Sequence, residues 1–200
     1  MTVSASTPRL RLTLFWYLLL LIAVAVTDRP CAQGVLGALA DLVGLVLIAA
    51  ASLGRVWTSV FIAGLKDAHL VTTGPYSRCR NPLYALSLVG GTGVGLATGS
   101  MFLTAATLVL LLVLYLRAIL AEERYLAERH GETFRQYCAE VPRLWPRSAT
   151  RAYPAAVEVN VAVYAKAFRD AGSFVLLFVA LQLIDVLRAQ GWLPTLATLW

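Results

Sequence analysis

Two polar stretches of the sequence hold the residues that could do chemistry, and the first runs from residue 70 to residue 84. It contains Gly74-Pro75, which is typical of a turn, and Pro82, which suits the first position of a helix because its missing N–H would lack a partner there. Between them lie Tyr76 and Asn81, an aromatic ring and an amide that donates or accepts hydrogen bonds but cannot titrate. On its own, this stretch is equally typical of a basic loop before a helix that begins at proline.

The second stretch begins where an apolar block ends, with the adjacent carboxylates Glu122 and Glu123. Good helix formers continue past them, Gly131 predicts a helix end, and residues 132–139 predict a second short helix. Val141-Pro142-Arg143 then begins an irregular segment. A carboxylate can bind a cation and an arginine can bind an anionic group. Taken alone, however, two adjacent glutamates are also typical of a helix face in water.

The two stretches together resemble a known family. The pattern G-P-Y-x-x-x-R-N-P-x-Y, then E-E-x-x-L and G-x-x-[YF]-x-x-Y-x-x-x-V-P-R, is similar to the isoprenylcysteine carboxyl methyltransferases and phospholipid methyltransferases. The resemblance covers about residues 55–147, across a hairpin of two apolar blocks. It implies a membrane methyltransferase whose cavity for S-adenosylmethionine is built from the cytosolic ends of membrane helices. The sequence likewise has no G-x-G-x-x-G after a strand, the mark of the soluble dinucleotide-binding fold.

The resemblance also implies roles for single residues. Asn81 matches a position where many members have histidine, and Ala118 matches an arginine that contacts substrate in the eukaryotic enzymes, so Arg117 lies one position away from it. The catalytic candidates are Arg117, Glu123 and Arg143. The candidates for binding the cofactor are Ala68, His69, Leu70, Val71, Tyr76, Arg80, Asn81, Pro82, Leu83, Tyr84 and Glu122.

Transfer of a methyl group from a sulfonium needs few groups. Either carboxylate of the pair at 122–123 could meet the cofactor's ammonium, and Arg80 or Arg143 its carboxylate. Tyr76 or Tyr84 could meet the adenine ring. A site that excludes water helps mainly by positioning, and neither a metal nor a covalent nucleophile is required. An acceptor carboxylate would need no base, whereas an acceptor amine would first have to lose its proton.

Composition predicts the elements that must position these residues. Of the 200 residues, 59% are hydrophobic and 14% charged, with a mean hydropathy of +0.72, so lipid is the expected solvent. We predict an all-α polytopic protein that forms one membrane domain over residues 1–200, with the motifs in 55–147 and an interfacial segment plus the last span in 148–200. Gly91-x-x-x-Gly95 predicts close packing of one span. About five spans are expected, at 12–27, 35–53, 82–98, 101–116 and 171–187.

Basic residues predict the orientation of these spans. With the N-terminus inside, Arg29 and Arg188 alone of the 17 Lys and Arg residues fall outside, as the positive-inside rule favours. The predicted active site is therefore cytoplasmic, and a bacterial inner membrane is the expected location. The same distribution, flanking apolar blocks, does not indicate a nucleic-acid groove. Three widely spaced cysteines, Cys31, Cys79 and Cys138, do not support a zinc site or a disulfide framework.

The acceptor is expected to be lipophilic and to enter from the bilayer. It could be the carboxylate of a prenylated thiol, a lipid amine or another amphiphile, although Asn81 weakens the case for a prenylated protein. Two other functions stay open. One is a membrane reductase of the steroid-reductase type, which would bind NADPH instead of S-adenosylmethionine. The other is a membrane scaffold or transport subunit with no enzymatic activity and no cofactor.

Overall fold

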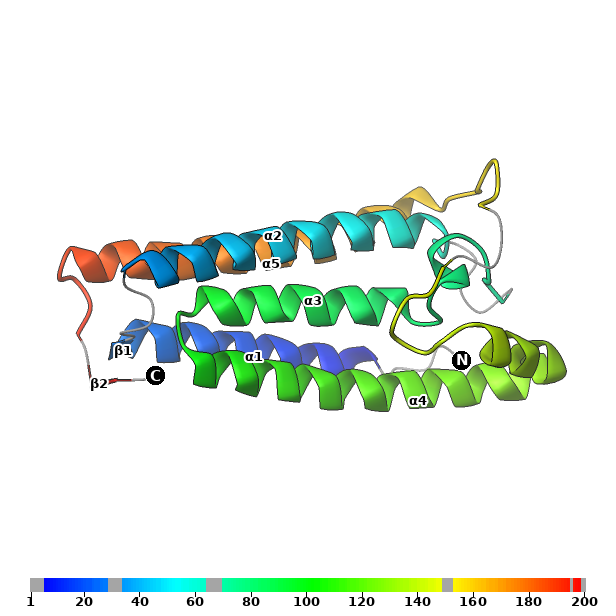
Figure 1. The fold of residues 1–200 in the computed structure, drawn as a ribbon, viewed down its shortest axis with the longest axis horizontal. Helices are drawn as coiled ribbons and strands as arrows, with labels where there is room; N and C mark the ends of the chain where they lie inside the picture. The colour runs from blue at the N-terminus through cyan, green and yellow to red at the C-terminus, as the bar shows by residue number, and fades with distance from the viewer. Residues whose placement is uncertain (1–5, 29–33, 64–69, 149–152, 195, 199–200) are drawn as a thin grey trace. The chain divides into compact units, whose positions relative to one another are not determined.

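The computed structural model describes residues 6–28, 34–63, 70–148, 153–194 and 196–198. Helices make up nearly all of its regular structure, which confirms the all-α prediction (Figure 1). The described strands have two residues each and pair in parallel. In chain order the elements are α1 (Ser6–Val26), β1 (Thr27–Asp28), α2 (Gly34–Val60), the 3-10 turn η2 (Gly74–Ser77), α3 (Pro82–Ala97), α4 (Met101–Glu140), α5 (Val161–Ala189) and β2 (Ala197–Thr198).

The chain is a membrane protein. Within the described residues, α2, α4 and α5 are long and apolar enough to cross a bilayer. Two shorter apolar helices, at Arg11–Val26 and Pro82–Ala97, account for the other two predicted spans. Many large apolar side chains point outward, such as Leu36 with 79% of its surface exposed, which is the arrangement that lipid favours.

Three helices extend beyond their predicted spans: α1 begins at Ser6, and α2 and α5 have contacts that explain their extension. α2 continues through Arg55 to Val60, because Arg55 Nη1 donates to the Leu83 carbonyl oxygen at 3.2 Å and to Ser87 Oγ. These contacts satisfy a charged side chain that would otherwise favour the end of a membrane helix. α5 begins at Val161, ten residues before its predicted start, with Asn160 Oδ1 accepting from the Val163 N–H as a helix cap.

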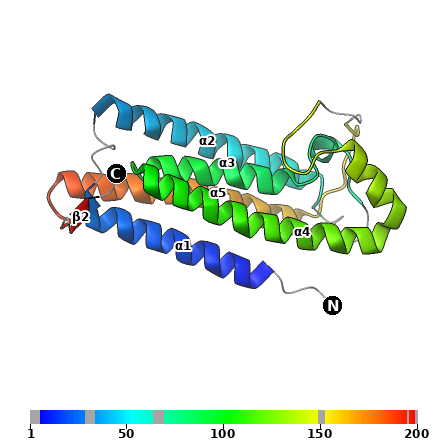
Figure 2. The same cartoon turned by 60° about the horizontal axis from the view of Figure 1, so that its bottom comes forward.

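The chain divides into two units, and the long helices contribute a part to each. Unit 1 comprises Met1–Ala49, Gly90–Leu114 and Phe174–Trp200. In unit 1, α1 lies along the first part of α4, where Trp16 Nε1 donates to Thr107 Oγ1 at 3.2 Å (Figure 2). The buried core of unit 1 contains Leu20, Val24, Ile48, Val94, Ala97, Leu103, Phe174, Leu177 and Leu181.

Glycines let α2 and α3 approach closely in unit 1. A Cβ on Gly93 would lie 2.6 Å from the Gly44 carbonyl oxygen, and a Cβ on Gly44 would lie 2.8 Å from the Gly93 carbonyl oxygen. The two backbones therefore touch without room for a side chain. Gly91 and Gly95 similarly face Leu111 and Thr104 of α4, which confirms the predicted close packing.

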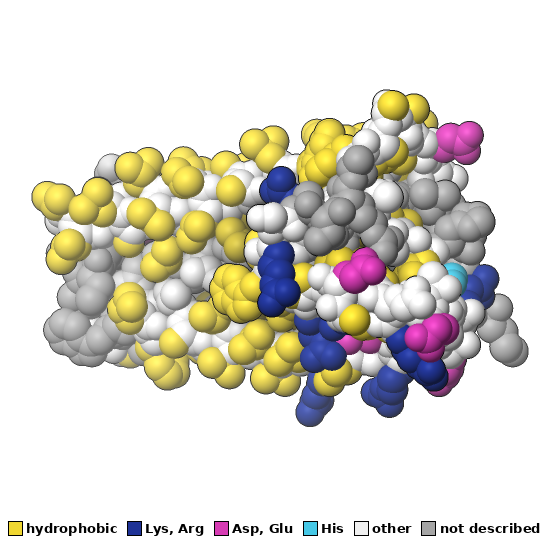
Figure 3. Space-filling view, turned by 45° about the vertical axis from the view of Figure 1, so that its right-hand side comes forward, with side chains coloured by type: hydrophobic (Ala, Val, Ile, Leu, Met, Phe, Trp, Pro, Cys, Tyr) yellow, Lys and Arg dark blue, Asp and Glu magenta, His cyan; other side chains and the backbone are white. Residues whose placement is uncertain are grey.

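Unit 2 comprises Ala50–Val89 and Tyr115–Ser173, and it contains both motif stretches. On the face shown in Figure 3, charged side chains gather over the C-terminal part of α4 and the neighbouring loops, which belong to this unit. Unit 2 also has a small core of Phe134, Tyr137 and Val141, with Leu70, Leu126 and Cys138 packed against it. Unit 2 therefore holds both motif stretches and the charged side chains gathered around them.

The contact of Gly93 with Gly44 leads to a stability prediction. Gly93→Ala should lower the free energy of unfolding by about 1–3 kcal/mol, because the added methyl forces α2 and α3 apart. Gly172→Ala is the matched control, since a Cβ there meets nothing within 4 Å and should leave stability equal or slightly higher. Thermal unfolding of both variants in one detergent measures this. Equal midpoints would show that the two helices can separate without cost.

Candidate active site

The first motif folds around a glycine that no other residue can replace without strain. Gly74 has φ +61°, and a Cβ on it would lie 2.4 Å from Cε1 of the Phe61 ring. Ser77 Oγ donates to the Gly74 carbonyl oxygen at 2.7 Å and closes the 3-10 turn η2. The turn directs Tyr76 inward, where 7% of its surface is exposed.

Asn81 connects this turn to α3. Its carbonyl oxygen accepts the backbone N–H groups of Tyr84 and Ala85, both at 3.1 Å, so Asn81 caps the helix that Pro82 begins. Its side chain is buried beside the polar part of α4. There Asn81 Nδ2 lies 3.3 Å from Glu123 Oε1.

The adjacent carboxylates of α4 have different partners. The hydroxyl of Tyr84 donates to Glu122 Oε2 at 3.1 Å. The Tyr84 ring also packs against the ring of Tyr115, with centroids 5.5 Å apart. Tyr115 and Glu122 are seven residues apart on α4, close to two helical turns, and therefore face the same side.

Glu123 is instead held by two guanidinium groups. Arg80 Nε lies 3.2 Å from Glu123 Oε1, and both side chains are nearly buried, with 11% and 13% of their surfaces exposed. The Arg80 Nε–H is within ion-pair distance of Glu123 but is not aligned for a hydrogen bond. Arg80 Nη1 donates instead to the Cys138 carbonyl oxygen at 3.0 Å. Arg143 donates to Glu123 Oε2 from Nη2 at 2.8 Å and from Nε at 3.1 Å.

The loop after α4 returns to the first motif through backbone contacts. The Arg80 N–H donates to the Pro142 carbonyl oxygen at 2.9 Å, and the Arg147 N–H to the Arg78 carbonyl oxygen at 3.0 Å. Gly131 interrupts α4 with φ +52° and ψ −121°, so the end of the helix changes direction. On that end, the Tyr137 hydroxyl donates to the Tyr76 carbonyl oxygen at 2.7 Å. The return of the chain therefore fixes the position of the turn.

Burial and charge shift the ionisation of several groups here. Burial first, and the negative charge of Glu122 second, raise the pKa of the Tyr76 phenol, which therefore stays neutral. The hydrogen bonds and charge of Glu123 raise the pKa of Arg143. Burial raises the pKa of the Cys79 and Cys138 thiols, which disfavours their thiolates. The cluster therefore places the Arg143 guanidinium near the neutral phenol of Tyr76 and two neutral thiols.

The sequence matches the family described as phospholipid methyltransferase over residues 32–133, half of the chain. That range contains the turn, the start of α3 and both glutamates. The chain belongs to the phospholipid methyltransferase family. Membership confirms the resemblance seen in the two motifs. The loop that carries Arg143 follows the matched range.

Two relatives of this chain have names that concern metals. The chain is 34% identical over 157 residues to the nickel-cobalt-cadmium resistance protein NccN of Alcaligenes xylosoxydans xylosoxydans, covering 78% of this chain and 73% of the relative. It is 33% identical over 156 residues to the cobalt-zinc-cadmium resistance protein CzcN of Cupriavidus metallidurans, covering 78% and 72%. No solved structure matches the chain.

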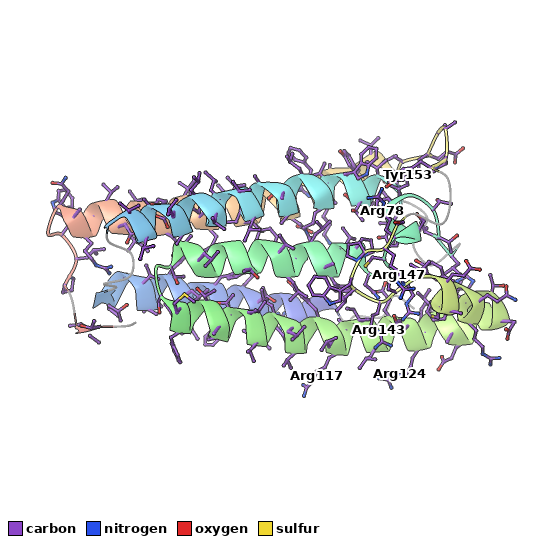
Figure 4. The ribbon with its side chains drawn as sticks, in the orientation of Figure 1. Arg78, Arg117, Arg124, Arg143, Arg147 and Tyr153 are labelled. Atoms are coloured by element: carbon purple, nitrogen blue, oxygen red, sulfur yellow. The ribbon has the colours of Figure 1, made fainter. Side chains whose placement is uncertain are left out.

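The structure brings most of the predicted site residues together but separates one of them. Arg117 is exposed and points away from the helices on the outer side of α4, as Arg124 does (Figure 4). Arg143, by contrast, lies at the loop beside α4 (Figure 4). Ala68 and His69 lie outside the described residues.

The apolar candidates of the first motif have packing contacts. Leu70 packs against the core of Phe134, Tyr137 and Val141, and Val71 is half-buried next to it. Pro82 is buried as the first residue of α3. Leu83 offers its carbonyl oxygen to Arg55 and to Ser87 Oγ. These residues position the polar groups.

Two aromatic residues of the site were not given a role by the sequence. Tyr115 lies seven residues before Glu122, and this helical spacing was the signal that could have placed it beside Tyr84. Tyr137 was part of the motif, but its bond to the Tyr76 carbonyl oxygen depends on the bend at Gly131. The sequence pattern could not reveal that bend's direction.

The Glu123 contacts lead to a second stability prediction. Glu123→Ala should cost about 3–5 kcal/mol of unfolding free energy, because it leaves the nearly buried Arg80 charge without its carboxylate. Arg143→Ala should cost about 1 kcal/mol, since that side chain is 44% exposed and Glu123 keeps its other partners. Thermal unfolding in one detergent distinguishes the two.

The matched control for this comparison is Glu132→Ala. Glu132 pairs with Arg135 at 3.0 Å on the surface, where both side chains are mostly exposed, so the change should stay within about 0.5 kcal/mol. If Glu123→Ala were as mild as Glu132→Ala, the cluster would not hold the loop to α3.

Proposed function

We propose that the chain is an integral membrane methyltransferase that uses S-adenosylmethionine and methylates a lipophilic acceptor. The observation that carries this proposal is the meeting of two distant segments in unit 2. Tyr84 and Asn81, at the start of α3, contact Glu122 and Glu123, where α4 becomes polar. Membership of the phospholipid methyltransferase family supports the reaction class.

The residues of this cluster fit the chemistry of the cofactor. Bound S-adenosylmethionine would supply a sulfonium methyl group, together with an ammonium and a carboxylate that the protein must hold. Glu122, oriented by the Tyr84 hydroxyl, is suited to bind the ammonium. Arg80 carries a buried Nε–H that donates to no acceptor among the described residues and could turn to an incoming carboxylate. The buried, neutral Tyr76 supports an aromatic contact.

The different partners of the glutamates support different roles. Glu123 touches two arginines and Asn81, so we assign it to positioning and not to the catalytic role that the motif implied. Arg143 then acts through Glu123. Arg117, which points outward from α4, fits a contact with lipid headgroups.

A thermal-shift comparison tests the function directly. S-adenosylmethionine and S-adenosylhomocysteine should raise the unfolding midpoint of the purified protein, and NADPH should not, because a ligand stabilises the folded state that binds it. Stabilisation by NADPH alone would favour a membrane reductase. Failure of all three ligands to stabilise the protein would favour a scaffold without a cofactor.

The assigned role of Glu122 gives a prediction about affinity. Glu122→Gln should weaken binding of S-adenosylhomocysteine by about 1.5–3 kcal/mol, the usual value of a hydrogen bond to a charged group. Glu128→Gln is the control, because Glu128 is exposed on the same helix. Calorimetry measures both dissociation constants. Equal affinities would place the ammonium elsewhere.

We propose that the N-terminus and the cluster are cytoplasmic, in a bacterial inner membrane. The distribution of Lys and Arg along the sequence supports this orientation. Ser148→Cys, made in a variant without the three native cysteines, should react with a membrane-impermeant maleimide only after the cytoplasmic side is opened. Labelling of intact cells from outside would reverse the orientation.

We also propose that the acceptor enters from the bilayer. The polar stretches of unit 2 are too short to form a closed soluble domain, so the cavity must share its walls with membrane helices. Acceptor analogues should gain up to about 0.8 kcal/mol of affinity per added methylene, while S-adenosylhomocysteine affinity stays constant. Measurements in one nanodisc system, corrected for partitioning, test this. Equal turnover of a chainless, water-soluble acceptor would argue against it.

The names of the relatives suggest where such a reaction would matter. Among the residues that the structure describes, no three His, Cys, Asp or Glu side chains gather as a metal site would require. We therefore propose that any part of this chain in metal resistance comes from the methylated acceptor. Comparing the metal tolerance of cells that carry the wild type or Glu122→Gln tests this, and equal protection by both would contradict it.

A further inference from the structure

The side-chain amide of Asn81 is held in one orientation. With 7% of its surface exposed, it donates from Nδ2 to Glu123 Oε1 at 3.3 Å and to the Arg143 carbonyl oxygen at 3.2 Å. An amide nitrogen has two hydrogens, and these contacts use both. The carbonyl oxygen Oδ1 is then the one polar atom of the side chain that remains.

The chemistry of the neighbours excludes the opposite orientation. The Glu123 carboxylate, paired with two arginines, and the Arg143 backbone carbonyl accept hydrogen bonds and do not donate them. Turning the amide over would bring Oδ1 against two acceptors and leave Nδ2 without either bond. The guanidinium groups of Arg80 and Arg143 also face the two oxygens of Glu123, so this carboxylate serves as an acceptor on every side that the described residues occupy.

Oδ1 is therefore fixed and available. Within the described part of the chain, no donor is bonded to Oδ1. Oδ1 is also not one of the fully buried polar atoms without a partner, so a ligand can reach it. A hydrogen-bond acceptor that is already oriented loses little entropy when a ligand binds. It favours an N–H group and disfavours a carboxylate or phosphate oxygen.

We propose that Asn81 Oδ1 is a preset hydrogen-bond acceptor for an N–H donor of a ligand, and that Glu123 is the positioning residue that presets it. This inference rests on the proposed function and refines it. The resemblance implies a histidine at this position in many family members. A histidine can donate or accept a hydrogen bond, whereas Asn81 in this setting accepts one. The N–H donor can belong to the cofactor, as its α-ammonium or its adenine amine, or to an amine on the acceptor.

Calorimetry with S-adenosylhomocysteine and two analogues tests the cofactor as the source. One analogue has a hydrogen in place of the α-amino group, and the other has a dimethylated adenine amine without N–H. If the cofactor is the source, Asn81→Ala should weaken binding of the natural compound about tenfold or more. It should not further weaken the analogue that lacks the recognised donor. Asn160→Ala, which removes a helix cap outside the site, should leave all three affinities unchanged.

Turnover measurements test the acceptor as the source. If the acceptor supplies the donor, Asn81→Ala leaves S-adenosylhomocysteine affinity unchanged and raises KM about tenfold for an amine acceptor, with kcat less affected. Glu123→Gln should produce a weaker form of the same pattern, because a neutral amide oxygen holds Asn81 Nδ2 less strongly than a carboxylate does. The double variant should then lose less than the sum of the single losses.

The outcomes separate this inference from the proposed function. If the wild type fails to bind S-adenosylhomocysteine, both are wrong. If the wild type binds it but Asn81→Ala changes neither affinity nor KM, the inference alone is wrong. An equal loss for the natural compound and for both analogues, with KM unchanged, also overturns it, because Asn81 would then act on the fold and not on a donor.

Discussion

A single carboxylate, that of Glu123, holds together three parts of the chain that are far apart in sequence. It comes from the polar end of α4 and contacts Arg80 and Asn81 before α3, as well as Arg143 after α4. Glu123 and Arg80 have little contact with water, so their charges must compensate each other. The start of α3, the end of α4 and the returning loop can therefore move only as a group, and the candidate site depends on that group.

The neighbouring glutamate shows how one residue of helical rotation separates two roles. Successive side chains on an α-helix point about 100° apart. Glu122 consequently faces the Tyr84 hydroxyl and the aromatic pair, whereas Glu123 faces the arginines. A positioning group and a ligand-binding group can thus be built from two identical residues. Such a division suits a small membrane protein, where few polar side chains are tolerated beside lipid.

The sequence predicted what depends on local pattern and missed what depends on distant partners. Apolar blocks predicted the helices, and Gly131 predicted the break in α4, because both follow from composition over one or two turns. The extension of α2 past Arg55 was not predicted, since it depends on acceptors that α3 supplies. The motif could not reveal that Arg117 points outward, because a rotation of α4 by one residue decides it.

The motif also did not predict that Glu122 and Glu123 have different partners. The family resemblance implied that Glu122 and Glu123 lie near the first stretch, and the structure brings them there. Their partners differ because Arg143 returns through the bend at Gly131 and the turn at Gly74 sets the position of Arg80. Both glycines have positive φ, a property that the sequence pattern permits but does not specify.

The backbone angles of Gly131 restrict the handedness of any other residue that could replace it. A Cβ there would meet nothing within 4 Å, so space is not the reason that the position favours glycine. Its φ of +52° and ψ of −121° are the mirror image of angles at the edge of the ordinary extended region of an L-residue. A D-alanine introduced by semisynthesis would therefore fit with little strain, while its L-enantiomer, with the same atoms, would not. At this point the return of the chain to the site depends on chirality alone.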